Sequence, residues 1–306
     1  MKILVTGGAG YIGTELVYTL AQHAAVSEIV VYDNLSRDNF NLFINGKMSN
    51  YQKVRFVKGD LLDSRQLKKS LQGVDVVYHL AAKVTTPFAN TDPHFFEQVN
   101  HWGTAELVYA LESSDVQKLI YTSSAGVYGA SASPLDETAI PNPKTFYAIS
   151  KMRGEEHVAR LADKLNTVIF RCGNVYGYSK SMRFDAVINK FVFESNFDKR
   201  IAINGDGRQH RSFIHIDDIT KALAQLVSVN LESGTYNLVT RDLVLLDIVD
   251  ILKQQIPELE FIFINQHLKL RELRIKPNAE INRRLSIDTL GSFEDELKEF
   301  RSHLSF

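Results

Sequence analysis

The sequence predicts an α/β protein built on a doubly wound parallel sheet, with a smaller α/β domain toward its C-terminal end. Short apolar runs alternate with longer stretches of helical periodicity through the first 170 residues, which is typical of a parallel sheet covered on both faces. A glycine-rich turn separates the first apolar run from the first helical stretch. At 306 residues the chain is also near the size at which one core divides into two.

Six apolar runs are predicted to form the strands of the main sheet. Since parallel neighbours need a crossover between them, the helical stretches that separate the runs fit the same sheet. The predicted strands are Lys2–Thr6, Glu28–Tyr32, Val54–Val57, Val74–His79, Lys118–Thr122 and Thr167–Arg171. The predicted helices between them cover residues 12–23, 64–72, 94–114 and 147–164.

After Arg171 the alternation becomes irregular, which indicates a second domain. A helix is predicted at 183–195 and a short strand at 201–203, and Asp217 and Asp218 favour a helix N-terminus ahead of an apolar run that ends near Val229. A strand at Thr235–Val239 and a helix at Leu245–Gln254 follow. We therefore expect residues 1–172 and a returning segment, about 211–239, to form the main domain, and residues 173–210 and 240–306 to form the smaller one.

Composition excludes several classes of partner. The 35 basic and 36 acidic residues leave a formal charge of −1, which gives no bulk attraction to nucleic acid or to an anionic membrane.

The chain begins in a strand, without a signal peptide, and no apolar run approaches eighteen residues, so we expect a cytoplasmic protein. The single cysteine, Cys172, fits a reducing compartment and is expected to be a small buried hydrophobe. No metal site is predicted.

Three glycines predict a dinucleotide site. Gly7, Gly10 and Gly13 follow an apolar strand directly and open an amphipathic helix. In this setting the first glycine permits a tight turn, the second lets the backbone approach a pyrophosphate, and the third allows the helix to pack on the strand. The first domain is therefore predicted to be a Rossmann domain.

An acidic residue at the end of the second strand indicates which dinucleotide binds. Asp33 lies twenty residues beyond Gly13, where its carboxylate can accept hydrogen bonds from the adenosine ribose hydroxyls and would repel a 2′-phosphate. NAD is therefore favoured over NADP, although Arg37 is a feature that would suit NADP. Asp60, after the third strand, could meet the adenine edge.

Two pairs of polar residues are candidates for the catalytic groups. Tyr147 and Lys151 are spaced i, i+4 and so lie on one face of a helix, where an ammonium would lower the pKa of the phenol toward neutrality. Ser123 and Ser124 follow the fifth strand at the carboxyl edge, where open α/β sheets bind their ligands.

Taken in order, these motifs resemble the extended short-chain dehydrogenase/reductase family, and most closely its NAD-dependent nucleotide-sugar epimerases and dehydratases of the UDP-hexose 4-epimerase type. The resemblance covers about residues 1–240. The motifs that carry it are TGGAGYIG, Asp33, HLAA at 79–82, Asn100, TSSAGVYG, YAISK and GDGRQHRSFIHIDDI.

The resemblance implies a role for each matching residue. Ser124 would bind the reacting sugar oxygen, Tyr147 would be the acid/base, and Lys151 would bind the nicotinamide ribose and tune the tyrosine. The positions implied to bind NAD are Gly7, Gly10, Tyr11, Ile12, Gly13, Asp33, Asn34, Asp60, Leu61, Leu80, Ala81, Ala82, Lys83, Asn100, Ser123, Tyr147 and Lys151.

The smaller domain is implied to bind a nucleotide-diphosphate sugar. Its contacts would come from Asn174, Arg211 and Arg183 together with Ser124, since arginine pairs with phosphate in bidentate fashion. A surface salt bridge between Arg211 and Asp217 or Asp218 is the alternative for that arginine.

The residues around Ser124 narrow the reaction. Dehydratases of the family resemble one another in a Thr-Asp-Glu triplet at this place, whereas this chain has Ser124, Ala125 and Gly126. The leading hypothesis is therefore a C4 epimerase that oxidises the sugar C4 hydroxyl and reduces the ketone again. A nucleotide-sugar C4 dehydrogenase or 4-ketoreductase with net turnover is one alternative, and a non-catalytic NAD-binding sensor is another.

Two helical stretches predict self-association. Residues 94–114 and 147–164 carry apolar stripes wide enough to pair across a two-fold axis, as the resembling family's dimers do. Phe95, Phe96, Trp102 and Tyr109 lie in the first stripe, where core or dimer packing is expected. We therefore predict a homodimer.

Overall fold

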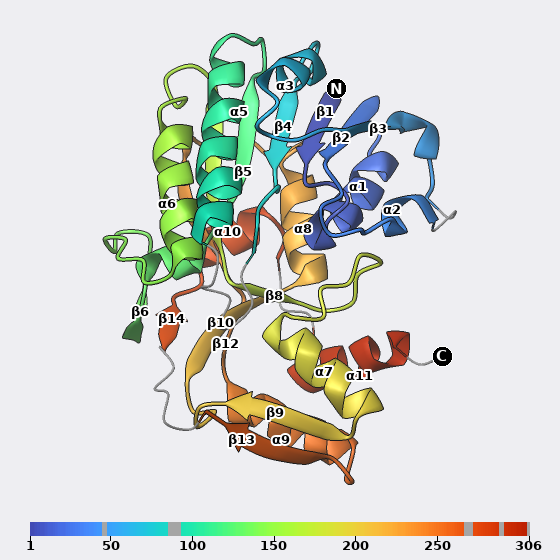
Figure 1. The fold of residues 1–306 in the computed structure, drawn as a ribbon, viewed down its shortest axis with the longest axis vertical. Coiled ribbons are helices and arrows are strands. Elements are labelled where there is room, and N and C mark those ends of the chain that lie inside the picture. The colour runs from blue at the N-terminus through green and yellow to red at the C-terminus, as the bar shows by residue number, and fades with distance from the viewer. Residues whose placement is uncertain (45–47, 85–92, 266–271, 288–290, 305–306) are drawn as a thin grey trace.

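A computed structural model describes residues 1–44, 48–84, 93–265, 272–287 and 291–304. Its centre is a seven-stranded sheet of order β11-β7-β5-β4-β1-β2-β3 in which every pair is parallel (Figure 1). The strands are β1 (Lys2–Thr6), β2 (Glu28–Asp33), β3 (Val54–Lys58), β4 (Val76–His79), β5 (Lys118–Ser124), β7 (Asn166–Cys172) and β11 (Gly234–Leu238). The six strands predicted from the sequence are therefore confirmed, and β11 adds the seventh as an edge strand.

The order of the strands fixes where a ligand can bind. From β1 the chain builds the sheet outward through β2 and β3, and it then returns to place β4 on the other side of β1. The direction of winding therefore reverses between β1 and β4. In an open parallel sheet such a reversal leaves a crevice beyond the carboxyl ends of the two strands.

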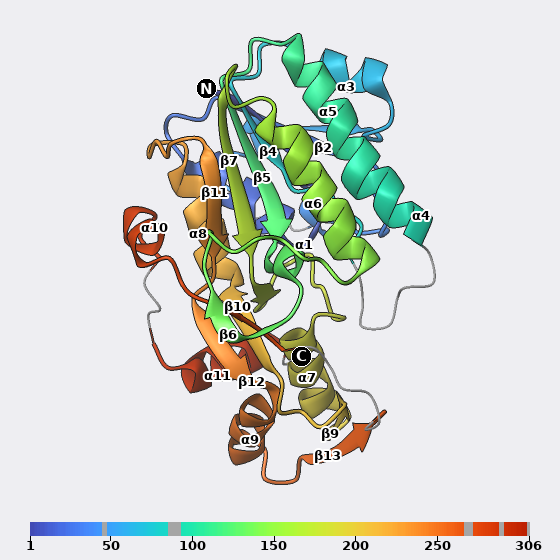
Figure 2. The ribbon, with the colours of Figure 1, turned by 90° about the vertical axis from the view of Figure 1, so that its left-hand side faces the viewer.

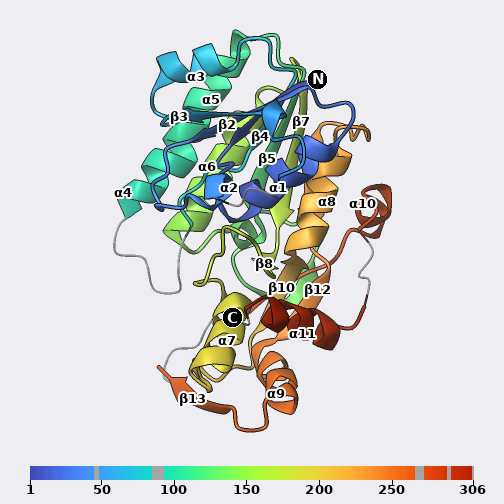
Figure 3. The same ribbon diagram turned by 90° about the vertical axis from the view of Figure 1, so that its right-hand side faces the viewer.

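Helices cover both faces of the sheet, as Figures 2 and 3 show from opposite sides. One face carries α1 (Tyr11–Gln22) and α8 (Ile216–Gln225), and the other carries α3 (Ser64–Ser70), α5 (Gly103–Glu112) and α6 (Phe146–Ala159). Each face has its own apolar core, because the strands are buried on both sides. This layering explains why the strands read as continuous apolar runs.

The helical stretch predicted at 94–114 is interrupted by a wider turn. It consists of α4 (Pro93–Phe96), a π-helical turn at Glu97–Trp102 and α5. Such turns redirect side chains within a helix and are common at functional sites. The buried residue Asn100 lies in this turn.

The smaller domain lies beyond the carboxyl edge of the sheet (Figure 1). It has its own core, formed by α7 (Val187–Phe197), α9 (Leu245–Gln255), α11 (Phe293–His303) and neighbouring strands. Its sheets are β12-β10-β8 and β13-β9, made of β8 (Asn174–Tyr176), β9 (Arg200–Asn204), β10 (His210–His215), β12 (Arg241–Val244) and β13 (Glu260–Ile264). Helix α7 begins at Val187 and not at the predicted 183, since residues 177–185 run in contact with α1 before the helix starts.

The remaining elements are short connections between these units. They are α2 (Asn41–Ile44), a 3₁₀ turn at Tyr51–Lys53, another at Ala125–Tyr128, β6 (Ser131–Leu135), which pairs with β14 (Leu273–Ile275), and α10 (Ala279–Arg284). Strand β10, in the segment expected to return to the main sheet, pairs with β8 and β12, whereas α8 and β11 after it belong to the main layers. No helix in the described ranges is long and apolar enough to cross a membrane.

Candidate active site

The glycine-rich turn after β1 is shaped for close backbone contact. Gly7 has φ +71°, and a Cβ there would lie 2.5 Å from the backbone nitrogen of Ala81. A Cβ on Gly13 would lie 2.2 Å from the carbonyl oxygen of Gly7. Both positions therefore require glycine, because a side chain would collide with backbone that cannot move aside.

Helix α1 presents its N-terminus to this turn. The N-cap residue is Gly10, no side chain caps the helix, and no acidic residue lies in its first turn. The amide groups and positive end of the helix dipole are therefore available to an anion such as a pyrophosphate.

A cavity lies between the glycine turn and the ends of β2, β3 and β4. Thirteen of the residues predicted to bind the cofactor line it: Gly7, Gly10, Tyr11, Ile12, Gly13, Asp33, Asn34, Asp60, Leu61, Leu80, Ala81, Ala82 and Lys83. Its wall also contains residues that were not predicted to bind NAD, among them Ser36, Asn39, Val84 and Val99, and it includes Arg37 and Arg183. All of these residues but Val99, which lies in the π-helical turn, come from loops, where no spacing rule marks a wall position.

Asp33 ties the second strand to the glycine turn. One carboxylate oxygen accepts a hydrogen bond from the Leu35 amide at 2.8 Å, and the other accepts one from the Ala9 amide at 3.0 Å. Burial raises the pKa of Asp33, and these two hydrogen bonds oppose that effect. Asp60 accepts a hydrogen bond from Asn34 Nδ2 at 3.0 Å across the same end of the cavity. This end is thus lined by carboxylates that suit ribose hydroxyls.

Asn100 supports the cavity from behind. Its Oδ1 accepts a hydrogen bond from the Lys83 amide at 2.7 Å, and its Nδ2 donates to the Lys83 carbonyl at 2.9 Å and to Ser150 Oγ at 3.0 Å. Asn100 is fully buried and does not line the cavity. Its amide therefore holds the Lys83 backbone that does.

Ser123 also faces the protein and not the cavity. Its hydroxyl donates to Glu155 Oε1 at 2.5 Å, and Glu155 forms a buried ion pair with Arg171, with 2.7 Å between Oε2 and Nη2. The ring of Tyr128 lies 4.7 Å below the Arg171 guanidinium. This buried group fastens α6 to β5 and β7 behind the predicted catalytic residues.

Helix α6 brings Tyr147 to the end of β5. The helix begins at Phe146, because the Thr145 hydroxyl caps it by accepting the Ala148 amide at 3.1 Å. Tyr147 is half-buried, and hydrogen bonding with Ser124, the last residue of β5, lowers its pKa. The Ser124 hydroxyl also accepts the Gly126 amide at 3.1 Å. The three predicted groups Ser124, Tyr147 and, one turn along α6, Lys151 thus converge at the carboxyl edge.

The charges around Tyr147 differ from the prediction. Burial raises the pKa of Tyr147, and the cation that lowers it is Arg183, with Ser124 adding a hydrogen bond in the same direction. Lys151 is not among the groups that shift the pKa of Tyr147 in the protein without its ligands, and its expected effect on Tyr147 stays a prediction. Lys151 is itself buried, which lowers its pKa to about 7, and its Nζ lies 4.1 Å from the centre of the Tyr121 ring. A partly neutral lysine cannot exert the full field of an ammonium.

His79 is a buried residue of this region for which the sequence predicts no role. Its Nδ1 lies 2.7 Å from Thr6 Oγ1 and its Nε2 lies 2.9 Å from Thr104 Oγ1. Burial, with Lys151 nearby, lowers the pKa of His79 to about 3, so the ring is neutral at physiological pH. The neutral ring links β1 and β4 to α5 and fixes the sheet at the point where the winding reverses.

The residues predicted to bind the nucleotide-sugar fall into two places. Asn174 on β8 and Arg211 on the neighbouring β10 lie in the smaller domain, and Asn174 Nδ2 donates to the Ser212 carbonyl at 3.0 Å. Within the described ranges the Arg211 side chain forms no hydrogen bond or ion pair, and burial lowers its pKa. The alternative salt bridge to Asp217 or Asp218 is therefore not present. Arg183 lines the cofactor cavity instead.

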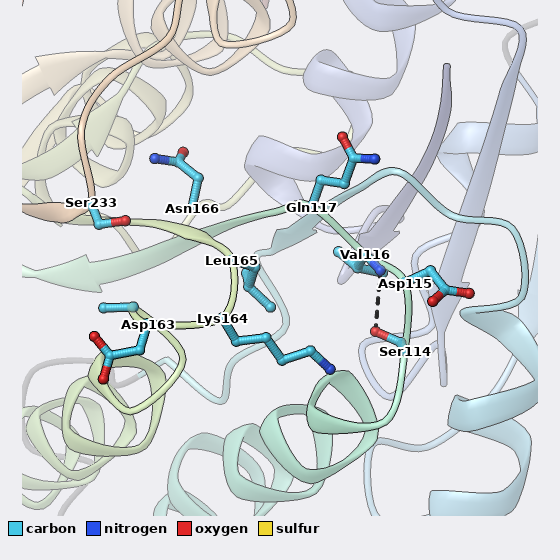
Figure 4. Close-up of a pocket in the computed structure, with 10 residues that line it drawn as sticks. Ser114, Asp115, Val116, Gln117, Asp163, Lys164, Leu165, Asn166 and Ser233 are labelled. Carbon is cyan, nitrogen blue, oxygen red and sulfur yellow. Dashed lines mark hydrogen bonds between the residues drawn. The ribbon is translucent and has the colours of Figure 1, made fainter.

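A second hollow lies at the opposite edge of the sheet (Figure 4). It is lined by the loops that lead into β5 and β7, residues 114–117 and 162–166, together with Ser233. Lys164 at its rim donates to the carbonyls of Leu111 and Glu112 at the end of α5. This hollow contains no glycine turn and is remote from Ser124, Tyr147 and Lys151, so the carboxyl edge remains the candidate site.

Comparison with known proteins agrees with this geometry. The model of the NAD dependent epimerase/dehydratase family matches residues 3–238. The chain is 32% identical over 248 residues to a dTDP-D-glucose 4,6-dehydratase of Mus musculus, covering 78% of this chain and 68% of the relative. It is 32% identical over 236 residues to a UDP-glucose 4-epimerase of Mycolicibacterium smegmatis, covering 74% and 72%.

Similarity to solved structures extends over the whole chain. The UDP-glucuronic acid 4-epimerase of Bacillus cereus, solved with UDP-glucuronic acid and NAD, is 26% identical and superposes with a TM-score of 0.83, covering 100% of both chains. The predicted fold class is thereby confirmed, and NAD is the cofactor of the family. The glycine turn, the open N-terminus of α1 and the carboxylate at Asp33 fit that cofactor. The chain belongs to the NAD-dependent epimerase/dehydratase family, a family of extended short-chain dehydrogenase/reductase enzymes.

Proposed function

We propose that this protein is a nucleotide-sugar C4 epimerase. The observation that carries the proposal is the meeting of Ser124 and Tyr147 at the carboxyl edge, beside a cavity fitted to NAD and with no acidic residue in the turn Ser124–Gly126. Bound NAD would take a hydride from the sugar C4 and return it. The residues of the chain then need only to move one proton and to hold the sugar.

Tyr147 is the proposed acid/base. Its phenolate would accept the proton of the C4 hydroxyl as the ketone forms, and its phenol would return a proton when the ketone is reduced from the other face. The hydrogen bond to Ser124 and the charge of Arg183 both favour the phenolate. Arg211, which has no ionic partner among the described residues, is proposed to bind the diphosphate in the smaller domain.

The relatives include dehydratases as well as epimerases, so the reaction has to be argued from this chain's own residues. Loss of water from the sugar needs a group that protonates the leaving hydroxyl, and Ala125 and Gly126 have no such group. Net C4 oxidation or reduction would use the same Ser124, Tyr147 and Lys151, and remains the second candidate. A sensor without catalysis would have no use for the three groups together.

The test is turnover of nucleotide-hexoses without added cofactor. The purified protein is expected to interconvert 4-epimers of at least one UDP-, dTDP- or GDP-hexose, and Tyr147→Phe is expected to reduce the rate by about 10²–10⁴-fold. Net dehydrogenase activity would instead require stoichiometric NAD or NADH. Failure with every common nucleotide-hexose, or unchanged turnover by the Tyr147→Phe variant, would refute the proposal.

We also propose that the protein is a homodimer formed through the outer face of α5 and the π-helical turn before it. Trp102 and Tyr109 are 53% and 42% exposed there, and Phe95 of the preceding helix α4 is 52% exposed. Phe96 turns inward and packs edge-on against Tyr147 with 6.2 Å between ring centres. Large exposed aromatic side chains on one face are typical of an interface.

A further inference from the structure

Residues 177–185, the crossing segment, run along the first turns of α1. The segment leaves β8 in the smaller domain and leads into α7. Ser179 Oγ donates to the Tyr11 carbonyl at 2.9 Å, Ser181 Oγ lies 2.6 Å from Thr14 Oγ1, and the Lys180 amide donates to Glu15 Oε1 at 2.8 Å. The segment is therefore attached to the helix that starts at the dinucleotide turn.

A buried hydrogen-bonded pair holds the centre of this contact. The Tyr11 hydroxyl donates to the Gly177 carbonyl at 2.7 Å and accepts a hydrogen bond from Asn189 Nδ2 at 3.1 Å. Asn189 Oδ1 accepts the Gly177 amide at 3.0 Å, and Nδ2 also donates to the Arg183 carbonyl at 2.9 Å. Asn189 is completely buried and Tyr11 is 9% exposed. Tyr11 of the glycine-rich turn thus contacts the start of the crossing segment directly at Gly177, and it contacts Arg183 through Asn189.

The crossing segment places Arg183 at the wall of the cofactor cavity. Asp185 orients the guanidinium, with 3.0 Å between Nε and Oδ1, and the same carboxylate lies 3.9 Å from Arg37 on the same wall. Two cations, Arg37 and Arg183, therefore share the carboxylate of Asp185 beside the cavity. The field of Arg183 also reaches Tyr147, whose pKa it lowers.

We propose that Tyr11 and Asn189 are positioning residues that hold Arg183 against the bound dinucleotide, so that Arg183 is part of the NAD site and only indirectly part of the sugar-diphosphate site. A pyrophosphate pairs with a guanidinium most strongly when the guanidinium is held in place beforehand. The inference rests on the assignment of this cavity to NAD and does not depend on C4 epimerisation.

The test uses NADH binding to the purified full-length chain, followed by the fluorescence of the reduced nicotinamide. Tyr11→Phe removes one hydroxyl, and we expect the Kd for NADH to rise about three- to tenfold. Arg183→Gln is expected to raise it about ten- to a hundredfold. In the double variant Tyr11→Phe should add nothing to Arg183→Gln, because the hydroxyl acts through the arginine.

Tyr78→Phe is the matched control. Tyr78 is completely buried, and its hydroxyl donates to the Leu223 carbonyl at 3.0 Å on the face of the sheet, away from the crossing segment. The two Tyr→Phe variants should lose similar melting temperature, but only Tyr11→Phe should bind NADH more weakly. Asn189→Asp, which removes the donations to the Tyr11 hydroxyl and to the Arg183 carbonyl, should reproduce the binding defect.

Three results would overturn the inference. Equal NADH affinities for the Tyr11→Phe and Tyr78→Phe variants would show that the hydroxyl only stabilises the fold. Multiplying effects in the double variant would show that Tyr11 acts independently of Arg183. An Arg183→Gln variant that binds UDP more weakly but NADH as before would place Arg183 in the sugar-diphosphate site. Each readout is independent of turnover, so a failed epimerase assay leaves the result interpretable.

Discussion

The amine of Lys151 is buried. Only 1% of the surface of this residue is exposed, and its Nζ lies over the face of the Tyr121 ring. Burial lowers its pKa to about 7 from the ordinary 10.5. The folded protein without ligands therefore binds this proton less tightly than the unfolded chain does. The charged lysine opposes folding most strongly below pH 7, and the effect fades as the pH rises toward 10.5, where both states release the proton.

The variant Lys151→Met tests this at the level of one residue. In the protein stripped of cofactor we expect the variant to be more stable than the wild type at pH 6, by about 1–4 kcal/mol. Methionine has a side chain of similar length and carries no charge into the interior. The gain should shrink as the pH approaches 10. Urea unfolding at several pH values measures it, and a gain that is absent at pH 6 or independent of pH would contradict the assigned environment.

The attachment of α6 to the sheet depends on Glu155, which is 6% exposed and pairs with Arg171 of β7. Removing one member of a buried ion pair leaves the other charge uncompensated. We expect Glu155→Gln to lower the free energy of unfolding by about 3 kcal/mol. Circular dichroism during denaturation with urea measures this change.

An exposed ion pair provides the control for this element. Glu112 at the end of α5 pairs with Arg160, with side chains 41% and 51% exposed. Glu112→Gln is expected to change stability by less than about 0.5 kcal/mol, because water already solvates both charges. Equal effects of the two substitutions would contradict the structural role assigned to Glu155.

The spacing of apolar residues in the sequence was enough to predict the strands and helices with a regular apolar pattern. The strands of the sheet and helices α1, α3, α6 and α9 were identified to within a few residues, because apolar burial on both faces of the sheet leaves a strong signal. The glycine turn predicted where the cavity starts, and the family resemblance supplied most of the other wall residues that were predicted. The crossing segment could not be predicted, since contacts such as that between Tyr11 and Asn189 join positions 178 residues apart. Asn100 and Ser123 were predicted to bind NAD, but in the structure their polar groups hydrogen-bond to other residues of the protein. Those partners are also distant in the sequence.

At the scale of the whole molecule, the proposed dimer would cover the exposed aromatic face of α5 with a second copy of the chain. Trp102→Glu places a charge at the centre of that face and is expected to give monomers at micromolar concentration, as measured by sedimentation velocity. Phe197→Glu on α7, where the ring is 44% exposed, is the control and should leave the mass unchanged. A wild-type protein that sediments as a monomer, or a Trp102→Glu variant that stays dimeric, would contradict the proposal.

A molecule that oxidises and then reduces one carbon of a nucleotide-sugar removes the hydrogen on that carbon and returns it, so an isotope label on that hydrogen reports the reaction. UDP-glucose and UDP-glucuronic acid labelled with deuterium at C4 would be incubated with the protein in ordinary water, and the products would be analysed by NMR. We expect 4-epimers that keep the deuterium at C4, because the hydride passes to bound NAD and returns to the same carbon. Loss of the deuterium to water, or its appearance at another carbon, would contradict it.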